Sequence, residues 1–317
     1  MKPPFTIVGL GEILWDVLPS GKQLGGAPSN FAYMASLLGD RGVVASRIGN
    51  DALGQETLNR MAGSPVDSGH LQRDAAHPTG TAQAPLDAGG QPKFTITENV
   101  AWDFLEWSAD WKDLADSADA VCFGTLAQRS PVSRQTILRF VRALPSHALR
   151  IFDVNLRQNY FSREILRESL KLSDVAKLSH EELPAVAELL GLPAAGDEPS
   201  ARQLVEKFSL KLVCITRGKH GSLLVTEKES AEHPGFQVTV ADTVGAGDAF
   251  TACLTHHYLR DCTLAGINEQ ANRFAAWVAS CPGGTPSLAG RELSEVLKLI
   301  GQNKSAPANP ARADSQI

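Results

Sequence analysis

Short apolar stretches alternate with amphipathic stretches along most of the chain. Apolar runs of strand length occupy residues 5–9, 42–47, 120–123, 150–154, 175–178, 211–216 and 222–226. Patterns typical of helices occupy residues 28–38, 52–61, 132–144, 164–171, 181–190, 202–208, 247–258 and 264–280, and Asp51 is a plausible N-cap for the second of these. This alternation predicts an α/β fold with a mostly parallel sheet covered by helices on both faces. Active sites of such sheets lie beyond the carboxyl ends of the strands, where glycine-rich loops enter helices.

The middle of the chain has a different pattern. Residues 79–86 and 93–98 are short β-type stretches, and the Asp-Ala-Gly-Gly sequence at 87–90 between them predicts a hairpin turn. We therefore expect a small sheet inserted into the α/β body. The last residues, 302–317, are polar and rich in Pro and Ala, so we predict a disordered tail after one domain at 1–301.

Composition narrows the classes of protein. The chain has 317 residues, 43% of them hydrophobic and 21% charged, which predicts a folded protein with a sizeable core. Its formal charge of −5 disfavours nucleic acid as a partner. The apolar runs are shorter than a membrane span, and the N-terminus has no signal-peptide pattern. The five cysteines lack metal-binding spacing, so we expect reduced core residues in a cytoplasmic protein.

The most informative motif precedes the apolar helix at 247–258. It reads Asp242-Thr243-Val244-Gly245-Ala246-Gly247-Asp248. Small residues at a helix N-terminus let backbone N–H groups cradle an anion such as a phosphate. A carboxylate beside that cradle can accept the proton of an attacking hydroxyl. The alternative is an ordinary glycine turn in which Asp248 is a favourable charge in the first helical turn.

Taken with an N-terminal motif, this segment resembles the ribokinase-like (PfkB) carbohydrate kinases, and among them the bacterial fructokinases. The N-terminal motif is Gly25-Gly26-Ala27-Pro28-Ser29-Asn30, and the stretch from Arg47 to Gly54 also matches the family. The resemblance covers residues 7–287. It implies a three-layer ribokinase-like sandwich with a small β-sheet lid, formed mainly by residues 12–26 and 71–106.

The resemblance also implies roles for individual residues. Asp248 is similar to the family's catalytic base, and Gly245, Ala246 and Gly247 to its anion hole. The residues that would bind the sugar are Asp16, Gly25, Gly26 and Asn30, together with Asn155 and Arg157 from an Asp-x-Asn-x-Arg stretch. For Arg157, an ordinary surface ion pair is an equally good reading.

Further matches imply ATP and metal sites. Thr216, Gly218 and Gly221 resemble the turn near the ATP phosphates, where Gly245 and Gly247 would also contribute, and Asn272 resembles a residue of the adenine pocket. Glu182 matches the acid that acts on Mg²⁺ through water, although Ser179 replaces the usual Asn of that motif. A K⁺ site is implied at Asp242, Val244, Val278, Cys281, Gly283 and Ser287.

These matches imply an ATP-dependent sugar kinase, with D-fructose as the favoured substrate and fructose 6-phosphate as the product. The alternatives are another sugar, such as 2-keto-3-deoxygluconate or ribose, and a catalytically silent sugar-binding regulator. A nucleotide-binding P-loop is absent from the sequence, and the Gly9-Leu10-Gly11 dinucleotide fingerprint is incomplete. The lid would exclude water from the sugar, and in this family it also pairs subunits, so we expect a homodimer.

Overall fold

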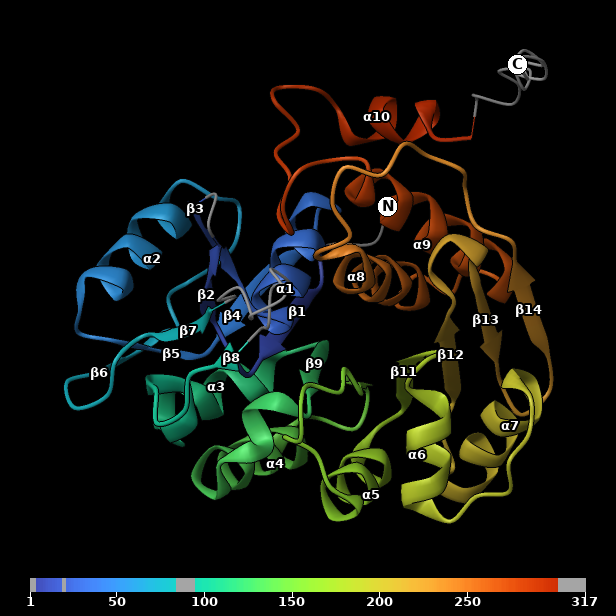
Figure 1. Cartoon of the computed structure of the whole chain (residues 1–317), viewed down its shortest axis with the longest axis horizontal. Helices are drawn as coiled ribbons and strands as arrows, with labels where there is room; N and C mark the ends of the chain where they lie inside the picture. The colour runs from blue at the N-terminus through green and yellow to red at the C-terminus, as the bar shows by residue number, and fades with distance from the viewer. Residues whose placement is uncertain (1–3, 19–20, 84–94, 302–317) are drawn as a thin grey trace, which may run out of the picture.

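The computed structural model describes residues 4–18, 21–83 and 95–301. Its centre is an eight-stranded sheet in the order β14-β13-β12-β11-β10-β9-β1-β4 (Figure 1). Six of its strands are parallel: β1 (Thr6–Leu10), β4 (Arg41–Ala45), β9 (Ala120–Gly124), β10 (Leu149–Asp153), β11 (Val175–Ser179) and β12 (Leu212–Thr216). The last two, β13 (Ser222–Val225) and β14 (Ser230–His233), are antiparallel and form one edge. The predicted fold class is confirmed.

Helices cover both faces of this sheet because its strands are apolar on both sides. Ile7, Ala120 and Cys122 pack on the face that carries α1 (Ala27–Leu37), α8 (Ala246–Tyr258), α9 (Leu264–Ala279) and α10 (Leu293–Leu299). Val8 and Val121 point the other way. That face carries α3 (Ala109–Ser117), α4 (Pro131–Ala143), α5 (Arg163–Leu172), α6 (Leu183–Leu190) and α7 (Asp197–Phe208). The result is the three-layer arrangement that alternating elements predict.

A separate four-stranded sheet lies beside α2 (Ala52–Ala62), to the left in Figure 1. Its order is β3 (Gly21–Gly25), β2 (Leu14–Leu18), β7 (Gly80–Gln83) and β8 (Thr95–Ile96). The predicted hairpin pairing is confirmed, since Ala82 lies opposite Ile96 in antiparallel register. Its predicted turn at 87–90, like the predicted disordered tail at 302–317, lies outside the described residues. Residues 72–74 form β6 (Gln72–Asp74), which pairs instead with β5 (Arg47–Gly49).

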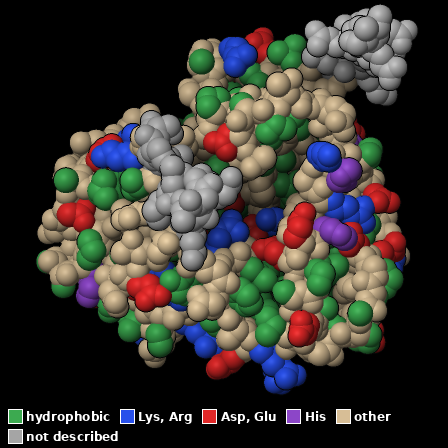
Figure 2. All heavy atoms as spheres, viewed as in Figure 1, with side chains coloured by type: hydrophobic (Ala, Val, Ile, Leu, Met, Phe, Trp, Pro, Cys, Tyr) green, Lys and Arg blue, Asp and Glu red, His purple; other side chains and the backbone are tan. Residues whose placement is uncertain are grey.

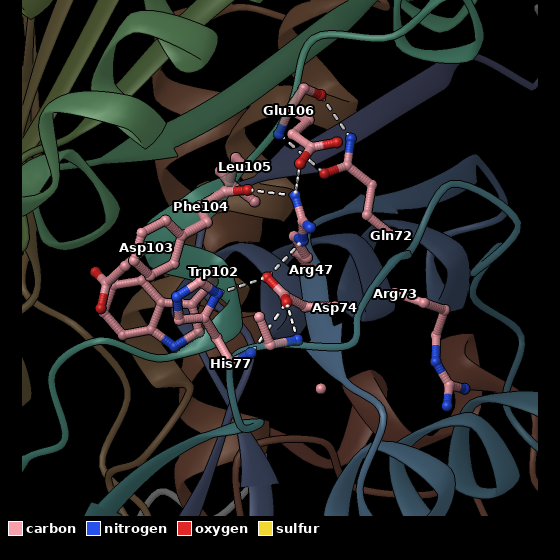
Figure 3. Close-up of polar contacts among 12 residues, drawn as sticks. Arg47, Gln72, Arg73, Asp74, His77, Trp102, Asp103, Phe104, Leu105 and Glu106 are labelled. Carbon is pink, nitrogen blue, oxygen red and sulfur yellow. Dashed lines mark hydrogen bonds and ion pairs between the residues drawn. The ribbon is translucent and has the colours of Figure 1, made fainter.

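Arg47 ties both ends of the inserted segment to the body (Figure 3). Its Nε lies 3.0 Å from Oδ2 of Asp74, and its Nη1 lies 2.6 Å from Oε1 of Glu106. Nη1 also donates to the carbonyl of Phe104 at 2.6 Å, and the Phe104 ring stacks on His77. The cluster therefore fixes the places where the chain leaves the body toward β7 and returns from β8.

Asp51 anchors the start of β7. One carboxylate oxygen caps α2 by accepting from the N–H of Gly54 at 2.7 Å, which confirms the predicted N-cap. The same side chain accepts from the backbone N–H and the hydroxyl of Thr79, both at 2.7 Å. Thr79 immediately precedes β7, so the Arg47 to Gly54 motif fixes the small sheet on the body.

Several elements escaped prediction. Helix α3 and strands β6 and β14 have weak apolar patterns, and helix α10 was missed although its apolar residues have helical spacing. Helix α7 starts at Asp197 rather than near residue 202. The expectation that the cysteines are core residues is wrong for Cys262, which is exposed, and only partly right for Cys281. Cys122, Cys214 and Cys253 are buried, and all five are free thiols. Within the described ranges, no helix is long and apolar enough to cross a membrane.

Candidate active site

Charged and polar residues gather beyond the carboxyl ends of β1, β10 and β11, where α1 and α8 begin. A narrow recess there is lined by Glu12, Ala27, Pro28, Phe31, Cys122, Phe123, Gly124, Asp153, Asn155 and Asp248. The space-filling view shows this face hollowed near its centre, with both acidic and basic side chains around the hollow (Figure 2). The position agrees with the rule for open parallel sheets.

The Gly25-Gly26 pair lets α1 start close to the small sheet. A Cβ at Gly25 would lie 2.7 Å from Oδ2 of Asp16, and one at Gly26 would lie 2.5 Å from the carbonyl oxygen of Glu12. Gly26 also has φ of +108°, which side chains disfavour. Any larger residue at either position would push the first turn of α1, and with it Asn30, away from Asp16 and Glu12.

The residues predicted to form the cradle lie at the amino end of α8, where the N–H of Ala246 donates to the carbonyl of Thr243 at 3.3 Å. Gly245 is its N-cap with φ of +77°, and a Cβ there would lie 2.5 Å from the carbonyl oxygen of Gly284. The small residues Ala246 and Gly247 form the first turn. First-turn N–H groups have no carbonyl partner within the helix, and the helix dipole favours an anion in front of them. The arrangement can therefore hold a phosphoryl group.

Asp248 follows this cradle directly and is partly buried. Its Oδ2 accepts a hydrogen bond from Nδ2 of Asn30 at 2.8 Å, so the two predicted residues meet. Burial raises the pKa of Asp248 to about 6, with a further contribution from Asp153, whereas Asn30, Lys177 and Arg157 act in the opposite direction. A carboxylate with such a pKa is ionised near neutrality and still accepts a proton well, as a general base must.

Glu12 is a site residue that sequence reasoning missed. It is 2% exposed, it lines the same recess, and its Oε2 has no hydrogen-bond partner. Burial raises its pKa to about 7, and the Asp248 charge adds to this rise. The sequence offered one sign of this role: Glu12 stands between apolar stretches that end at Leu10 and begin at Ile13, where a charged residue is unusual.

Asp153 and Lys177 form a buried ion pair that the sequence motifs did not predict. They lie opposite each other on β10 and β11, and Nζ of Lys177 is 3.1 Å from Oδ1 of Asp153. Both side chains are almost fully buried. A lysine inside the apolar strand predicted at 175–178 was the available signal, because buried lysines are rare unless paired.

The predicted sugar-binding residues converge on this region to different degrees. Asp16 lies on β2, and burial raises its pKa, while Arg157 acts to lower it. The Arg157 side chain is exposed, and its charge also acts to lower the pKa values of Glu12 and Asp248. Asn155 lines the recess with φ of +40°, a conformation that is uncommon outside glycine and concentrates at functional sites.

The predicted ATP residues lie at the end of β12 and on α9. Thr216 ends β12, and Gly218 begins the turn η3 (Gly218–His220). Gly221 is required by packing, since a Cβ there would lie 1.9 Å from the carbonyl oxygen of His233. Asn272 is buried, and its amide donates to Ser222 and to Asn268 within the protein. Its role in an adenine pocket stays a prediction.

Glu182 binds backbone rather than a side chain. Its two carboxylate oxygens accept from the N–H groups of Leu156 at 2.6 Å and of Ser179 at 2.7 Å. This carboxylate therefore joins the loop after β10 to the end of β11. It keeps unused lone pairs that a metal-bound water can approach, which fits an outer-sphere role toward Mg²⁺. No group of three or more metal-ligating side chains occurs in the part of the chain that is described.

The two loops proposed for K⁺ lie next to each other. Asp242 accepts from the N–H of Val244 at 3.0 Å and from the N–H of Gly283 at 3.2 Å, so its carboxylate links them. The carbonyl of Val278 already accepts from the N–H of Cys281, and the Ser287 hydroxyl accepts from the N–H of Ala289. Oxygen ligands suit a hard cation, and these contacts leave the K⁺ site a prediction.

Comparison with known proteins identifies the family of this chain. Residues 20–289 match the pfkB family carbohydrate kinases. The chain is 30% identical to the uncharacterized sugar kinase PH1459 of Pyrococcus horikoshii, over 86% of this chain and 88% of that protein. It is 31% identical to a fructokinase of Klebsiella pneumoniae, over 77% of this chain and 81% of that one.

Solved structures give the same result. The fructokinase of Xylella fastidiosa with bound ATP superimposes with a TM-score of 0.78 at 25% identity, covering 93% of this chain and 97% of that one. The uncharacterized sugar kinase PH1459 with ATP gives 0.72 at 28% identity, covering 92% and 99%. This chain belongs to the PfkB family of carbohydrate kinases, which are ATP-dependent phosphotransferases.

Proposed function

We propose that this protein is a fructokinase that transfers the γ-phosphoryl group of ATP to D-fructose and gives fructose 6-phosphate. The observation that carries the proposal is the position of Asp248 beside the N–H cradle at the start of α8, held there by Asn30. An acceptor hydroxyl in front of this carboxylate would lie next to the site of a bound phosphoryl group. That is the geometry that phosphoryl transfer to an alcohol requires.

In the proposed reaction, Asp248 accepts the proton of the primary hydroxyl as its oxygen attacks the phosphorus atom in line. The N–H groups of Gly245, Ala246 and Gly247 stabilise the charge on the transferred group. Asp16 accepts hydrogen bonds from sugar hydroxyls, and Asn30, Asn155 and Arg157 complete the sugar site. The close backbone approach at Gly25 and Gly26 keeps the start of α1, which carries Asn30, against Asp16 and the backbone of Glu12.

ATP would lie between the α8 cradle and the turn at Thr216, Gly218 and Gly221, near Asn272. Glu182 would hold a water of a bound Mg²⁺ ion, which would supply charge neutralisation on the phosphates. K⁺ would stabilise the loops at Asp242 and Gly283, behind the cradle. Each of these roles rests on the residue match to the family and on the placement described above.

Two features favour fructose over other sugars. The Gly-Glu-x-Leu-Trp-Asp sequence at 11–16 and the Asp-x-Asn-x-Arg stretch at 153–157 resemble those of fructokinases. The fructokinase of Klebsiella pneumoniae, at 31% identity, supports this choice. Ribose and 2-keto-3-deoxygluconate are the competing substrates.

The small sheet is proposed as a lid that excludes water from the acceptor site. Its strands β2 and β3 carry Asp16 and Gly25, so a movement of the sheet would carry sugar-binding residues with it. We further propose that the lid pairs with that of a second copy in a homodimer.

A coupled ADP-release assay with a panel of sugars tests the proposed function. We expect the highest kcat/KM with D-fructose, compared with D-ribose, 2-keto-3-deoxygluconate, D-glucose and no sugar. Higher kcat/KM with another sugar would overturn the fructose assignment and leave the kinase assignment standing. Sugar binding by calorimetry without ADP release from any sugar would favour the regulator instead.

A further inference from the structure

Lys177 is a buried cation that the proposed reaction does not yet use. It is 7% exposed, and its Nζ lies 3.1 Å and 3.2 Å from the two carboxylate oxygens of Asp153, which is 4% exposed. Burial alone would lower the pKa of a lysine ammonium group, but the carboxylates of Asp153, Glu182 and Asp248 raise it for Lys177. The side chain is therefore a permanent positive charge inside the protein.

This charge lies against the first turn of α8. A Cβ at Gly247 would lie only 3.1 Å from Nζ of Lys177, so the glycine makes room for the ammonium group. Thr251, one turn further along α8, donates to Oδ2 of Asp153 at 3.3 Å and to the carbonyl of Gly247 at 2.9 Å. The ion pair thus touches the helix turn that carries both the cradle and the base.

The surroundings of this turn are strongly acidic. The charged groups that act on Asp248 or share its recess are Glu12 after β1, Asp153 on β10, Lys177 on β11 and Arg157 after β10. Acidic Asp16 lies on β2, also within the influence of Arg157. A phosphoryl group would bring still more negative charge to this place. Cations close to it are therefore needed if the transferred group is to be stabilised.

We propose that Lys177, held by Asp153, is a positioning residue that puts a fixed positive charge under the first turn of α8, between the N–H cradle and the base Asp248. The inference rests on the proposed phosphoryl transfer and applies to any sugar acceptor. The charge assists the cradle in holding the transferred group, and it keeps Asp248 ionised in an acidic environment. Asp153 fixes the ammonium in place and opposes its effect on Asp248.

Three variants test the proposal: Lys177→Met, Asp153→Asn and the double variant. In Lys177→Met we expect kcat to fall by about 10-fold or more, with the KM for the sugar nearly unchanged, because the charge acts on the transferred group. The acidic limb of the kcat–pH profile should move to higher pH in Lys177→Met. It should move to lower pH in Asp153→Asn, because a negative charge near Asp248 is removed.

The double variant keeps the test decisive if Lys177→Met does not fold. It leaves no buried charge without a partner, so it avoids the main cause of unfolding. We expect it to keep the loss of kcat, since the positive charge under the cradle is still missing.

Arg260→Met is the matched control. Arg260 pairs with the buried Asp40, which precedes the edge strand β4, four strands away from β11 in the sheet. It should lower thermal stability and leave the acidic limb where it is in the unsubstituted protein. Unchanged kcat in the double variant would overturn the role of Lys177, because the two opposite shifts of the acidic limb offset each other there. An acidic limb that stays in place in a folded Lys177→Met variant would overturn it as well. Failure of the proposed function is distinguishable, because it would appear as absent sugar phosphorylation by the unsubstituted protein.

Discussion

Asn30 donates a hydrogen bond to Asp248 at 2.8 Å across 218 residues of sequence. It links the first helix of the N-terminal part, α1, to the helix that carries the cradle, α8. The other amide atom, Oδ1 of Asn30, is buried without a partner. The pair orients the carboxylate toward the recess and accounts for the presence of an amide in the first turn of α1.

Replacing Asp248 with Asn should nearly abolish turnover. The variant preserves size and hydrogen bonding to Asn30 but cannot accept the hydroxyl proton. We expect kcat to fall by about 10²–10⁴-fold, the usual contribution of a general base. Sugar and ATP binding, measured by calorimetry, should change much less. Near-normal turnover of a folded variant would show that another group accepts the proton.

The pH dependence of the reaction should report the same carboxylate. Because the pKa of Asp248 is raised to about 6, the active, ionised form is lost as the pH falls below that value. We expect log kcat/KM to decline with unit slope below about pH 6. Glu12→Gln should retain this limb, because the pKa of Glu12 is about 7 and belongs to a different group. A limb that disappears in Glu12→Gln would assign it to Glu12.

The ionised Asp248 carboxylate, which favours turnover, should lower the stability of the folded protein. Its pKa is about 6 in the folded protein against 3.8 ordinarily, so the folded state binds the proton more tightly. The ionised carboxylate therefore costs stability fully above about pH 6 and nothing below its unfolded pKa. Asp248→Asn should raise the free energy of unfolding at pH 8 by up to about 3 kcal/mol. Thermal unfolding at pH 8 and pH 4 measures this, and equal gains at both values would contradict the burial argument.

Asp16→Asn should mainly weaken sugar binding. It removes a charged acceptor from the small sheet and leaves the cradle and the base in place. A hydrogen bond to a charged group contributes about 1.5–3 kcal/mol, so the KM for the sugar should rise by about 10- to 100-fold. The KM for ATP, measured in the same assay, should stay within error. A rise in the KM for ATP alone would show that Asp16 contributes to the ATP site and not to the sugar site.

Arg47→Met should loosen the inserted segment. The substitution leaves Asp74, which is 2% exposed, without its guanidinium partner and frees Glu106 (Figure 3). We expect a loss of about 3 kcal/mol of stability and faster amide exchange in residues 72–74 and 101–106. Arg73→Met is the control, because Arg73 is exposed and bonds only to Asn50 among the contacts described. Equal effects of the two substitutions would contradict the anchoring role of Arg47.

The pattern of the amino-acid sequence was sufficient to predict the fold class, and it marked the two motifs that the structure brings together at the candidate site. Strands such as 120–123 and 175–178 are continuous apolar runs, so the sequence alone predicts that they are buried. The motifs at 25–30 and 242–248 are recognised by their glycines, which local backbone conformation and close packing require. Weakly patterned elements such as α3 and β14 escaped, because their positions depend on neighbours that are distant in sequence. The small sheet is narrower than predicted, because β6 pairs with β5 in a separate two-stranded sheet.

Which charged side chains lie next to one another depends on the folded chain. Glu12 stands in the Gly-Glu-x-Leu-Trp-Asp sequence without a predicted role, and Lys177 belongs to none of the quoted motifs. Each lies at the site because strands β1, β10 and β11 have their carboxyl ends on the same side of the sheet. Their protonation is likewise a property of the fold, since burial and neighbouring charges act through space and leave no trace in sequence spacing. For Asn272 and Glu182, the residue type could be matched to the family from the sequence, but their partners could not. Asn272 donates to Ser222, and Glu182 accepts from the backbone N–H of Leu156, only in the folded chain.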